Sequence, residues 1–277
     1  MTGLAGAPFL KMSGSGNDFV FFDVRAGDPH AVSDPDVIRR LCARGTGVGA
    51  DGVVLIERSE HAPYAMRYFN ADGTLASLCG NATLCAARLG IELGIVSQAQ
   101  AESGFRFHTG VGEVEARVVD GRPEIDLARP EGLREDVLGE IEGAPGELRA
   151  GYVEIGVPHL VILCEDAETA PVMERGRALR SHSSFPHGAN VNFISRRGND
   201  WRYRTYERGV ENETLACGTG AAACAVLLAQ WGAGSSTVRL WTSSGNELLV
   251  TLPIGGVSPP RLRGPVAIVF RGEIVEL

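Results

Sequence analysis

Short apolar runs rich in β-branched and aromatic residues recur along the chain and predict more strands than helices. They cover residues 19–24, 53–56, 66–69 and 114–119, and later 153–155, 160–164, 191–194, 202–206, 248–252 and 266–270. Runs of this length are typical of strands when turn residues separate them, and the chain has 36 glycines and 14 prolines. Because the expected strands do not alternate with helices, the pattern favours an α+β fold over a doubly wound α/β fold.

Three segments carry the start and stop signals of helices. They cover residues 34–42, 81–93 and 220–231. The first has Ser33 or Asp34 as its N-cap and Pro35 in its first turn, both of which favour helix initiation. The other two are rich in alanine and leucine and stop at Gly94 and Gly232, as helices commonly do.

The second half of the chain repeats landmarks of the first half in the same order. The pairs are Gly16 with Gly156, Gly49–Asp51 with Gly188–Asn190, Arg67–Asn70 with Arg204–Glu207, and Cys79–Asn81 with Cys217–Thr219. The spacing within each pair is 137 to 140 residues. Four collinear matches predict a duplicated domain. We expect halves of about 1–130 and 145–277, with the boundary in segment 120–150, which is rich in glycine, proline and glutamate.

Composition and charge narrow the class of protein. The 277 residues are 44% hydrophobic and 22% charged, which is ordinary for a globular protein. The formal net charge is −8 and no basic stretch stands out, which argues against nucleic-acid binding. No apolar run is long enough to span a membrane, and the N-terminal segment lacks the pattern of an export signal. We therefore expect a cytoplasmic protein with neither nucleic acid nor membrane as a partner.

Lys11 is the only lysine among the 26 basic residues. A pyridoxal-phosphate enzyme needs a lysine for its Schiff base, and Lys11 lies beside a Gly/Ser-rich turn near the N-terminus. Any amino-acid chemistry is therefore expected to proceed without that cofactor. The cysteines form no CxxC pair, which argues against a zinc ribbon and a thioredoxin-like redox site, and we expect no metal.

Two of the six cysteines, Cys79 and Cys217, directly precede an expected helix. A helix N-terminus carries unpaired backbone N–H groups and a partial positive charge. These stabilise a thiolate and can also bind a carboxylate. The other cysteines lie in apolar stretches and are interpreted as reduced core residues: Cys42, Cys85, Cys164 and Cys224.

A single cysteine before a helix is more often a packing residue than a catalytic one, but its occurrence at equivalent positions of two repeats reverses that expectation. A duplicated fold would present the two thiols to opposite faces of one bound carbon. Inverting a stereocentre by proton transfer needs this arrangement, because one group removes the α-proton and another returns a proton on the other side. The repeat therefore predicts a two-base inversion of an amino acid.

Five motifs, in this order, resemble those of the diaminopimelate epimerase family. They are GNDF at 16–19, FNADG at 69–73, CGN at 79–81, GVPH at 156–159 and YERGVENETLACGTG at 206–220. The resemblance spans almost the whole chain. It implies a cofactor-independent epimerase that interconverts LL- and meso-diaminopimelate in the synthesis of lysine and peptidoglycan precursors. It also implies two pseudo-symmetric domains, each a strand barrel around a central helix, with the active site in the cleft between them.

The resemblance assigns roles to individual residues. Cys79 and Cys217 would be the acid/base thiols, with His159 and Glu207 assisting in setting their protonation. The substrate-binding residues would be Asn17, Asn70, Gly80, Asn81, Asn190, Glu207, Arg208, Gly218 and Thr219. Diaminopimelate carries an amino-acid group at each end, so its unreactive end needs a cation for the carboxylate and acceptors for the ammonium. Arg208 beside Glu207 offers both.

The sequence departs from the family pattern before Pro-His and after the first Cys-Gly-Asn. Many members have asparagine where Val157 stands before Pro-His, and the familiar Gly-x-Arg that follows the first Cys-Gly-Asn is Ala82–Leu84 here. Neither departure touches the thiols, so the expected reaction type is unchanged.

Other interpretations remain open from the residues alone. The asparagines could be turn residues, and Glu207–Arg208 could be a solvated strand end. The alternative functions are a two-thiol racemase of related fold that acts on proline or hydroxyproline, and a non-catalytic amino-acid-binding module. The sequence also leaves the oligomeric state open, with a homodimer as one arrangement.

Overall fold

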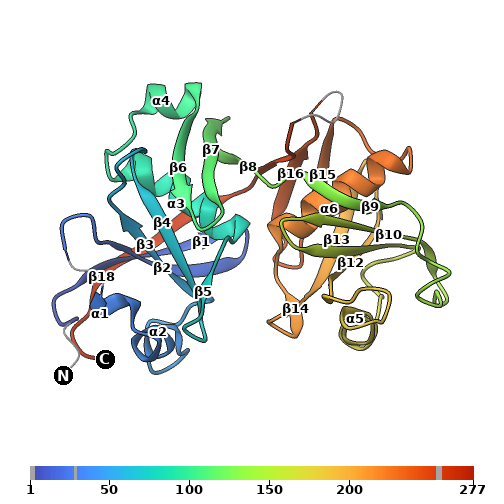
Figure 1. Ribbon diagram of the computed structural model, residues 1–277, viewed down its shortest axis with the longest axis horizontal. Coiled ribbons are helices and arrows are strands. Elements are labelled where there is room, and N and C mark those ends of the chain that lie inside the picture. The colour runs from blue at the N-terminus through green and yellow to red at the C-terminus, as the bar shows by residue number, and fades with distance from the viewer. Residues whose placement is uncertain (1–3, 28–29, 254–257) are drawn as a thin grey trace. The chain divides into compact units, whose positions relative to one another are not determined.

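The computed structural model describes residues 4–27, 30–253 and 258–277, which form two compact units. Unit 1 contains residues 1–125 and 264–277, and unit 2 contains residues 126–263. In both units strands outnumber helices (Figure 1), which confirms the expected α+β class. No helix within the described ranges has the length and apolar character needed to cross a membrane.

Unit 1 contains nine strands and four helices among its described residues. The strands are β1 (Pro8–Gly14), β2 (Asn17–Asp23), β3 (Gly52–Glu57), β4 (Ala65–Asn70), β5 (Leu75–Ala76), β6 (Phe105–Thr109), β7 (Gly112–Val119), β8 (Arg122–Asp126) and β18 (Val266–Glu273). The helices are α1 (His30–Ser33), α2 (Pro35–Cys42), α3 (Gly80–Glu92) and α4 (Gln98–Ser103).

Unit 2 repeats this arrangement of elements. Its strands are β9 (Pro130–Arg134), β10 (Glu147–Ile155), β11 (Pro158–Cys164), β12 (Asn190–Arg197), β13 (Asp200–Glu207), β14 (Asn212–Thr214), β15 (Thr237–Trp241), β16 (Glu247–Thr251) and β17 (Arg261–Arg263). Its helices are α5 (Val172–Arg180) and α6 (Gly218–Gln230).

Both units pair their strands in the same order and directions. Neighbours run β18–β1–β2–β3–β4–β6–β7–β8 in unit 1 and β9–β10–β11–β12–β13–β15–β16–β17 in unit 2. The parallel pairs are β2–β3 and β4–β6 in unit 1, and β11–β12 and β13–β15 in unit 2. The short strands β5 and β14 add antiparallel hairpins to β4 and β13. This agreement confirms that the fold is duplicated.

The last strand departs from the expected boundary. β18 pairs along its whole length with β1 and belongs to unit 1, so residues 145–277 do not form one unit. β9 likewise flanks β10 in unit 2. The chain therefore enters unit 2 at residue 126 and returns to unit 1 at residue 264. A comparison of the repeats in chain order does not reveal this exchange. β9 follows the first repeat in the chain but pairs in unit 2, and β18 follows the second repeat but pairs in unit 1.

Each unit packs its strands around one apolar helix, as expected (Figure 1). α3 contacts β1, β2, β4 and β18, and α6 contacts β10, β11, β12, β16 and β17. Both helices have 13 residues, and most of these are buried, as a helix that is apolar on all sides requires. Gly94 and Gly232 follow them with φ of 67° and 70°, which supports the predicted stops.

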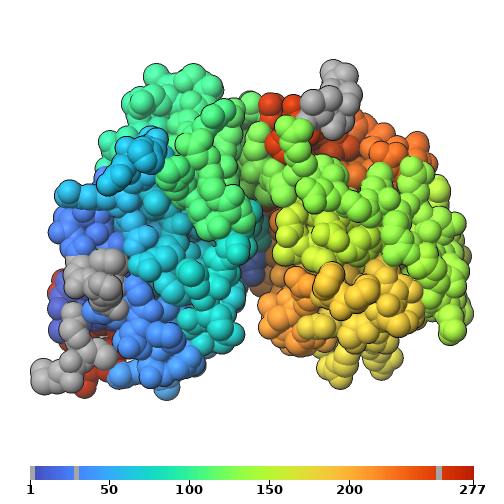
Figure 2. All heavy atoms as spheres, viewed as in Figure 1, coloured from blue at the N-terminus to red at the C-terminus, as the bar shows by residue number. Residues whose placement is uncertain are grey.

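A second helix in each unit connects the parallel pair that begins the repeat. α2 joins β2 to β3, and its N-cap is Asp34, whose carboxylate accepts the backbone N–H groups of Asp36 and Val37. α5 joins β11 to β12 and lies at the surface of unit 2 in the view of Figure 2. The sequence pattern missed α5, because only Val172, Gly176 and Leu179 of its nine residues are buried and its remaining positions are mostly polar.

The close approach of β1 to the start of α3 generates a stability prediction. A Cβ atom on Gly14 would lie 2.7 Å from the carbonyl oxygen of Asn81 and 2.9 Å from Sγ of Cys85. The backbone oxygen cannot move without displacing the helix. We expect Gly14→Ala to lower the free energy of unfolding by about 1–3 kcal/mol, as overpacking does. Chemical denaturation measures this loss. Gly27→Ala is the matched control, because within the described residues, chain neighbours aside, no atom lies within 4 Å of its added Cβ. An equal loss in both variants would contradict the prediction.

Candidate active site

Cys79 and Cys217 occupy matching N-cap positions. Cys79 precedes α3 with φ −136° and ψ 117°, and Cys217 precedes α6 with φ −130° and ψ 113°. Each cysteine carbonyl accepts the first hydrogen bond of its helix, from Thr83 at 2.9 Å and from Ala221 at 3.0 Å. The residues that follow, Gly80–Asn81 and Gly218–Thr219, form the first helical turns, and the backbone N–H groups of such turns can bind an anion.

In unit 1, two predicted site residues bind each other directly. The side-chain amide of Asn81 donates to Oδ1 of Asn17 at 2.6 Å, which joins the start of β2 to the start of α3. Asn17 in turn donates to the carboxylate of Asp51 at 3.0 Å. Asn17 is therefore fixed by tertiary contacts, which argues against its interpretation as a simple turn residue.

The first turn of α3 shows what replaces the familiar Gly-x-Arg. The hydroxyl of Thr83 donates to the carbonyl of Cys79 at 2.8 Å, and the side chain of Leu84 is fully buried. An arginine at position 84 would place a charge in this core, so its absence fits the packing of this chain.

Asn70 ends β4 and lies in the hairpin that leads toward Cys79. Its amide donates to the hydroxyl of Thr74 at 3.0 Å, while Thr74 also donates to Asp72 at 2.6 Å. No contact with the other predicted site residues is seen for Asn70 among the described residues of unit 1. Asp72 is thus bound within the turn, where the hydrogen bonds from Thr74 lower the pKa of its carboxyl.

The amine of Lys11 is engaged within unit 1. Its buried ammonium pairs with Asp18 at 2.6 Å and donates to the carbonyl of Gly49. Asp18 also pairs with Arg44 at 2.5 Å, and Arg44 reaches Asp51 at 2.8 Å. The cluster links the amine to the carboxylate that holds Asn17, and a buried paired ammonium is a poor candidate for a Schiff base.

In unit 2, Cys217 is buried and its sulfur receives a backbone hydrogen bond. The N–H of Gly220 donates to its Sγ at 3.4 Å, and the hydroxyl oxygen of Thr219 lies 3.5 Å from the same atom. A donated N–H favours the thiolate form of a cysteine. Gly220 permits the close packing here, because an added Cβ would lie 2.4 Å from both Oδ1 of Asn192 and the hydroxyl of Tyr203.

His159 is fully buried at the start of β11, opposite Asn190 of β12. Its Nδ1 lies 3.3 Å from Nδ2 of Asn192. Burial and the neighbouring charge of Arg208 lower the pKa of His159 to about 3, so the imidazole is neutral at physiological pH. Asn192 is not among the predicted site residues, because the sequence does not distinguish an asparagine with a specific partner from any other polar residue within a strand.

Glu207, Arg208 and Asn190 meet at one end of β12 and β13. The side-chain oxygen of Asn190 accepts the backbone N–H of Arg208 at 2.8 Å, and the guanidinium of Arg208 donates to the carbonyl of His187 at 2.5 Å. Thr214 donates its hydroxyl to the carboxylate of Glu207. The two charged side chains are thus held by partners on β14 and on the loop before β12, and they are not a freely solvated strand end.

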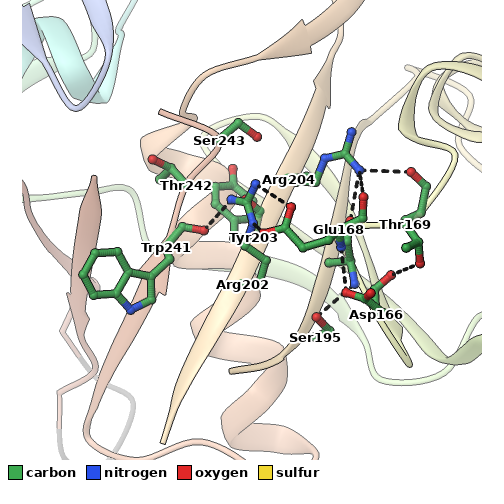
Figure 3. A network of polar contacts seen from close by, with 12 residues as sticks. Asp166, Glu168, Thr169, Ser195, Arg202, Tyr203, Arg204, Trp241, Thr242 and Ser243 are labelled. Carbon is green, nitrogen blue, oxygen red and sulfur yellow. Dashed lines mark hydrogen bonds and ion pairs between the residues drawn. The ribbon is translucent and has the colours of Figure 1, made fainter. Parts of the chain in front are cut away.

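Successive side chains of β13 alternate between buried and partly exposed positions. Figure 3 shows the residues of this strand with their polar contacts. Arg204 donates to the carbonyls of Ala167, Glu168 and Ala170. Its guanidinium also pairs with Glu213 of β14 at 2.7 Å. Tyr203, one residue earlier, faces inward and donates to the carbonyl of Cys217 at 3.0 Å. These contacts hold the hairpin that delivers Cys217 to the start of α6.

The other four cysteines are confirmed as core residues. Cys42, Cys85, Cys164 and Cys224 are all buried and free of disulfides. Burial raises the pKa of the Cys42 thiol to about 11 and of the Cys164 thiol to about 12, and it also holds the pKa of the Cys85 and Cys224 thiols well above the usual value. All four remain protonated at physiological pH.

The predicted site residues are divided between the two units. Unit 1 contains Asn17, Asn70, Cys79, Gly80 and Asn81, and unit 2 contains His159, Asn190, Glu207, Arg208, Cys217, Gly218 and Thr219. Within each unit, the cysteine lies at a helix start whose backbone can bind a carboxylate.

Two solved structures illustrate the likeness in fold. The phenazine biosynthesis protein of the PhzF family from Bacillus anthracis matches with a TM-score of 0.74 at 15% identity, over 97% of this chain and 98% of that one. A hydroxyproline epimerase from Agrobacterium vitis, with bound trans-4-hydroxy-L-proline, matches with a TM-score of 0.65 at 16% identity, over 99% and 94%. At these identities the likeness establishes the fold alone.

Sequence similarity is more specific. The family model for diaminopimelate epimerase matches residues 9–129 and 151–255. The diaminopimelate epimerase of Gemmatimonas aurantiaca is 48% identical, over 97% of this chain and 99% of that protein. The diaminopimelate epimerase of Aquifex aeolicus is 38% identical, over 97% and 98%. This chain therefore belongs to the diaminopimelate epimerase family.

Proposed function

We propose that this protein interconverts LL- and meso-diaminopimelate without a cofactor, by proton transfer between the thiols of Cys79 and Cys217. The observation that carries the proposal is the duplicated N-cap: two cysteines with nearly the same backbone dihedrals begin two buried 13-residue helices in two units of one topology. One thiolate would remove the α-proton, and the other thiol would return a proton to the opposite face.

The α-proton of an amino acid is a very weak acid, so the carbanion formed on its removal must be stabilised. Backbone N–H groups at the starts of α3 and α6 would bind the adjacent carboxylate and stabilise the charge that develops on it. Gly80 and Asn81, with Gly218 and Thr219, supply those first turns. The N–H bond from Gly220 to the sulfur of Cys217 supports a thiolate at that position.

The unreactive end of the substrate needs complementary charges. Arg208 would pair with its carboxylate, and Glu207, Asn190 and Asn70 would accept from or donate to its amino-acid group. Asn17 would hold Asn81 and contact the substrate. This recognition of a second amino-acid group favours diaminopimelate over proline, which lacks one.

The proposal places the protein in the cytoplasm, in the synthesis of lysine and peptidoglycan precursors. The structure describes all six cysteines without a disulfide bond, as is typical of proteins in a reducing compartment. The partner is a small molecule, and a homodimer remains a prediction from the sequence.

Isotope exchange tests the substrate. We expect the purified protein in deuterated water to incorporate deuterium at the α-carbon of LL-diaminopimelate and to form the meso isomer, because each turnover returns a proton from solvent-exchanged thiols. Proton NMR and chiral chromatography follow the two events. L-Proline serves as the alternative substrate. Exchange of proline alone would contradict the proposal, and binding of diaminopimelate without exchange would favour a binding module.

Replacement of either thiol tests the mechanism. We expect Cys79→Ala and Cys217→Ala each to lower kcat for epimerisation by at least about 10³-fold, since each removes one proton donor or acceptor. Circular dichroism and thermal unfolding check that both variants fold. Cys42→Ala is the control, because it removes a buried thiol from α2 with no place in the proposed reaction. Turnover near the wild-type rate in either helix-start variant would eliminate the two-base mechanism.

A further inference from the structure

The Nε2 atom of His159 is a buried polar atom whose role the contacts of unit 2 do not explain. The side chain is fully buried, and no hydrogen-bond partner for its Nε2 lies within the described part of the chain. Its other nitrogen, Nδ1, lies 3.3 Å from Nδ2 of Asn192. A buried imidazole nitrogen without a partner calls for an explanation, because unsatisfied polar atoms in the interior are costly.

The orientation of the Asn192 amide is determined by its other partners. Nδ2 lies 2.9 Å from the carbonyl oxygen of Leu160 and 3.5 Å from that of Asn190, and carbonyl oxygens only accept. On the opposite side, Oδ1 accepts the hydroxyl of Thr205 at 3.0 Å and lies 3.4 Å from the hydroxyl of Tyr203. A flipped amide would set its oxygen against the carbonyl oxygens of Leu160 and Asn190, so the NH₂ group faces His159.

The facing NH₂ group determines the protonation of the imidazole. A donor on Asn192 requires Nδ1 of His159 to accept, and the single proton of a neutral imidazole then lies on Nε2. Both the Nδ1–H tautomer and the imidazolium would set two donors against each other. Geometry thus selects the neutral Nε2–H form.

The surroundings of His159 act in the same direction. Burial and the positive charge of Arg208 disfavour the imidazolium. Other titratable groups in this part of unit 2 are Glu207 at the end of β13, Tyr203 within it, Cys217 before α6 and Cys224 within α6. Tyr203 links Asn192 to the carbonyl of Cys217, so the amide belongs to the same packed region as the thiol.

We propose that Asn192 is a positioning residue that holds His159 as the neutral tautomer with its proton on Nε2, and that His159 serves as a hydrogen-bond donor to an anionic group of the site and not as a proton-accepting base. The second half of this proposal rests on the function proposed above. The first half concerns the resting protein and can be tested without substrate.

The test is NMR spectroscopy of the wild-type protein labelled with ¹³C and ¹⁵N. We expect Nδ1 of His159 to have the shift of an unprotonated nitrogen and Nε2 that of a protonated one, unchanged between about pH 5 and about pH 9, where an ordinary histidine titrates. The signal is assigned by side-chain correlations and by its loss in His159→Gln. A proton on Nδ1, or titration within that range, would overturn the proposal.

Asn192→Asp tests the positioning role, because a carboxylate accepts where the amide donates. We expect the proton of His159 to move to Nδ1 and the imidazole to become protonated nearer neutral pH. kcat should then fall about tenfold or more and acquire a new pH dependence. KM should change less than about threefold, because Asn192 acts through His159. A merely structural role would lower stability and leave the tautomer and the pH profile unchanged.

Asn199→Asp is the matched control, because it makes the same chemical change in an exposed turn of unit 2. We expect it to leave both the NMR signal and kcat as in the wild type. Wild-type kcat together with an unmoved proton in Asn192→Asp would overturn the proposal, and if that variant does not fold, the wild-type spectrum decides. Absence of diaminopimelate turnover in the wild type would refute the proposed function but not the tautomer.

Discussion

The structure depends on how closely neighbouring segments pack against the first turn of each buried helix. A cysteine at an N-cap can use the helix N–H groups only if its helix start is held in place and shielded. Unit 1 achieves this with β1, which passes at Gly14 where no side chain fits, and unit 2 with Gly220, which lets Asn192 and Tyr203 reach the helix. Glycine at these positions makes room for the packing that fixes each sulfur.

Much of the fold could be predicted because its strongest signals are local. Alanine- and leucine-rich runs that end at Gly94 and Gly232 predicted both central helices, and of the two predicted N-caps, Ser33 and Asp34, it is Asp34 that caps α2. α5 was missed because its surface position leaves few apolar residues. The place of β18 was missed for a different reason: pairing with β1, more than 250 residues away in the chain, leaves no trace in local periodicity.

The candidate site was predictable where a residue is part of a repeated motif, and not where its role depends on tertiary partners. The repeat located Cys79 and Cys217, and the family resemblance indicated the residues that flank them. Asp51 and Asn192 were not identified. Each acts through a side chain remote in sequence, Asp51 by accepting from Asn17 and Asn192 by facing His159. Such roles are visible only once the strands are paired.

The two repeats have the same strand order but differ in the polar groups that the strands carry. This difference suits the proposed epimerisation. At the first paired position of these parallel strands, unit 1 has Phe19 opposite Gly52, whereas unit 2 has His159 opposite Asn190. The symmetry of the helix starts suits an inversion, in which two groups act on opposite faces. The substrate proposed here is not symmetric about its reacting carbon, because its second amino-acid group lies on one side. A site for it needs matched thiols and unmatched surroundings, and duplication followed by divergence produces both.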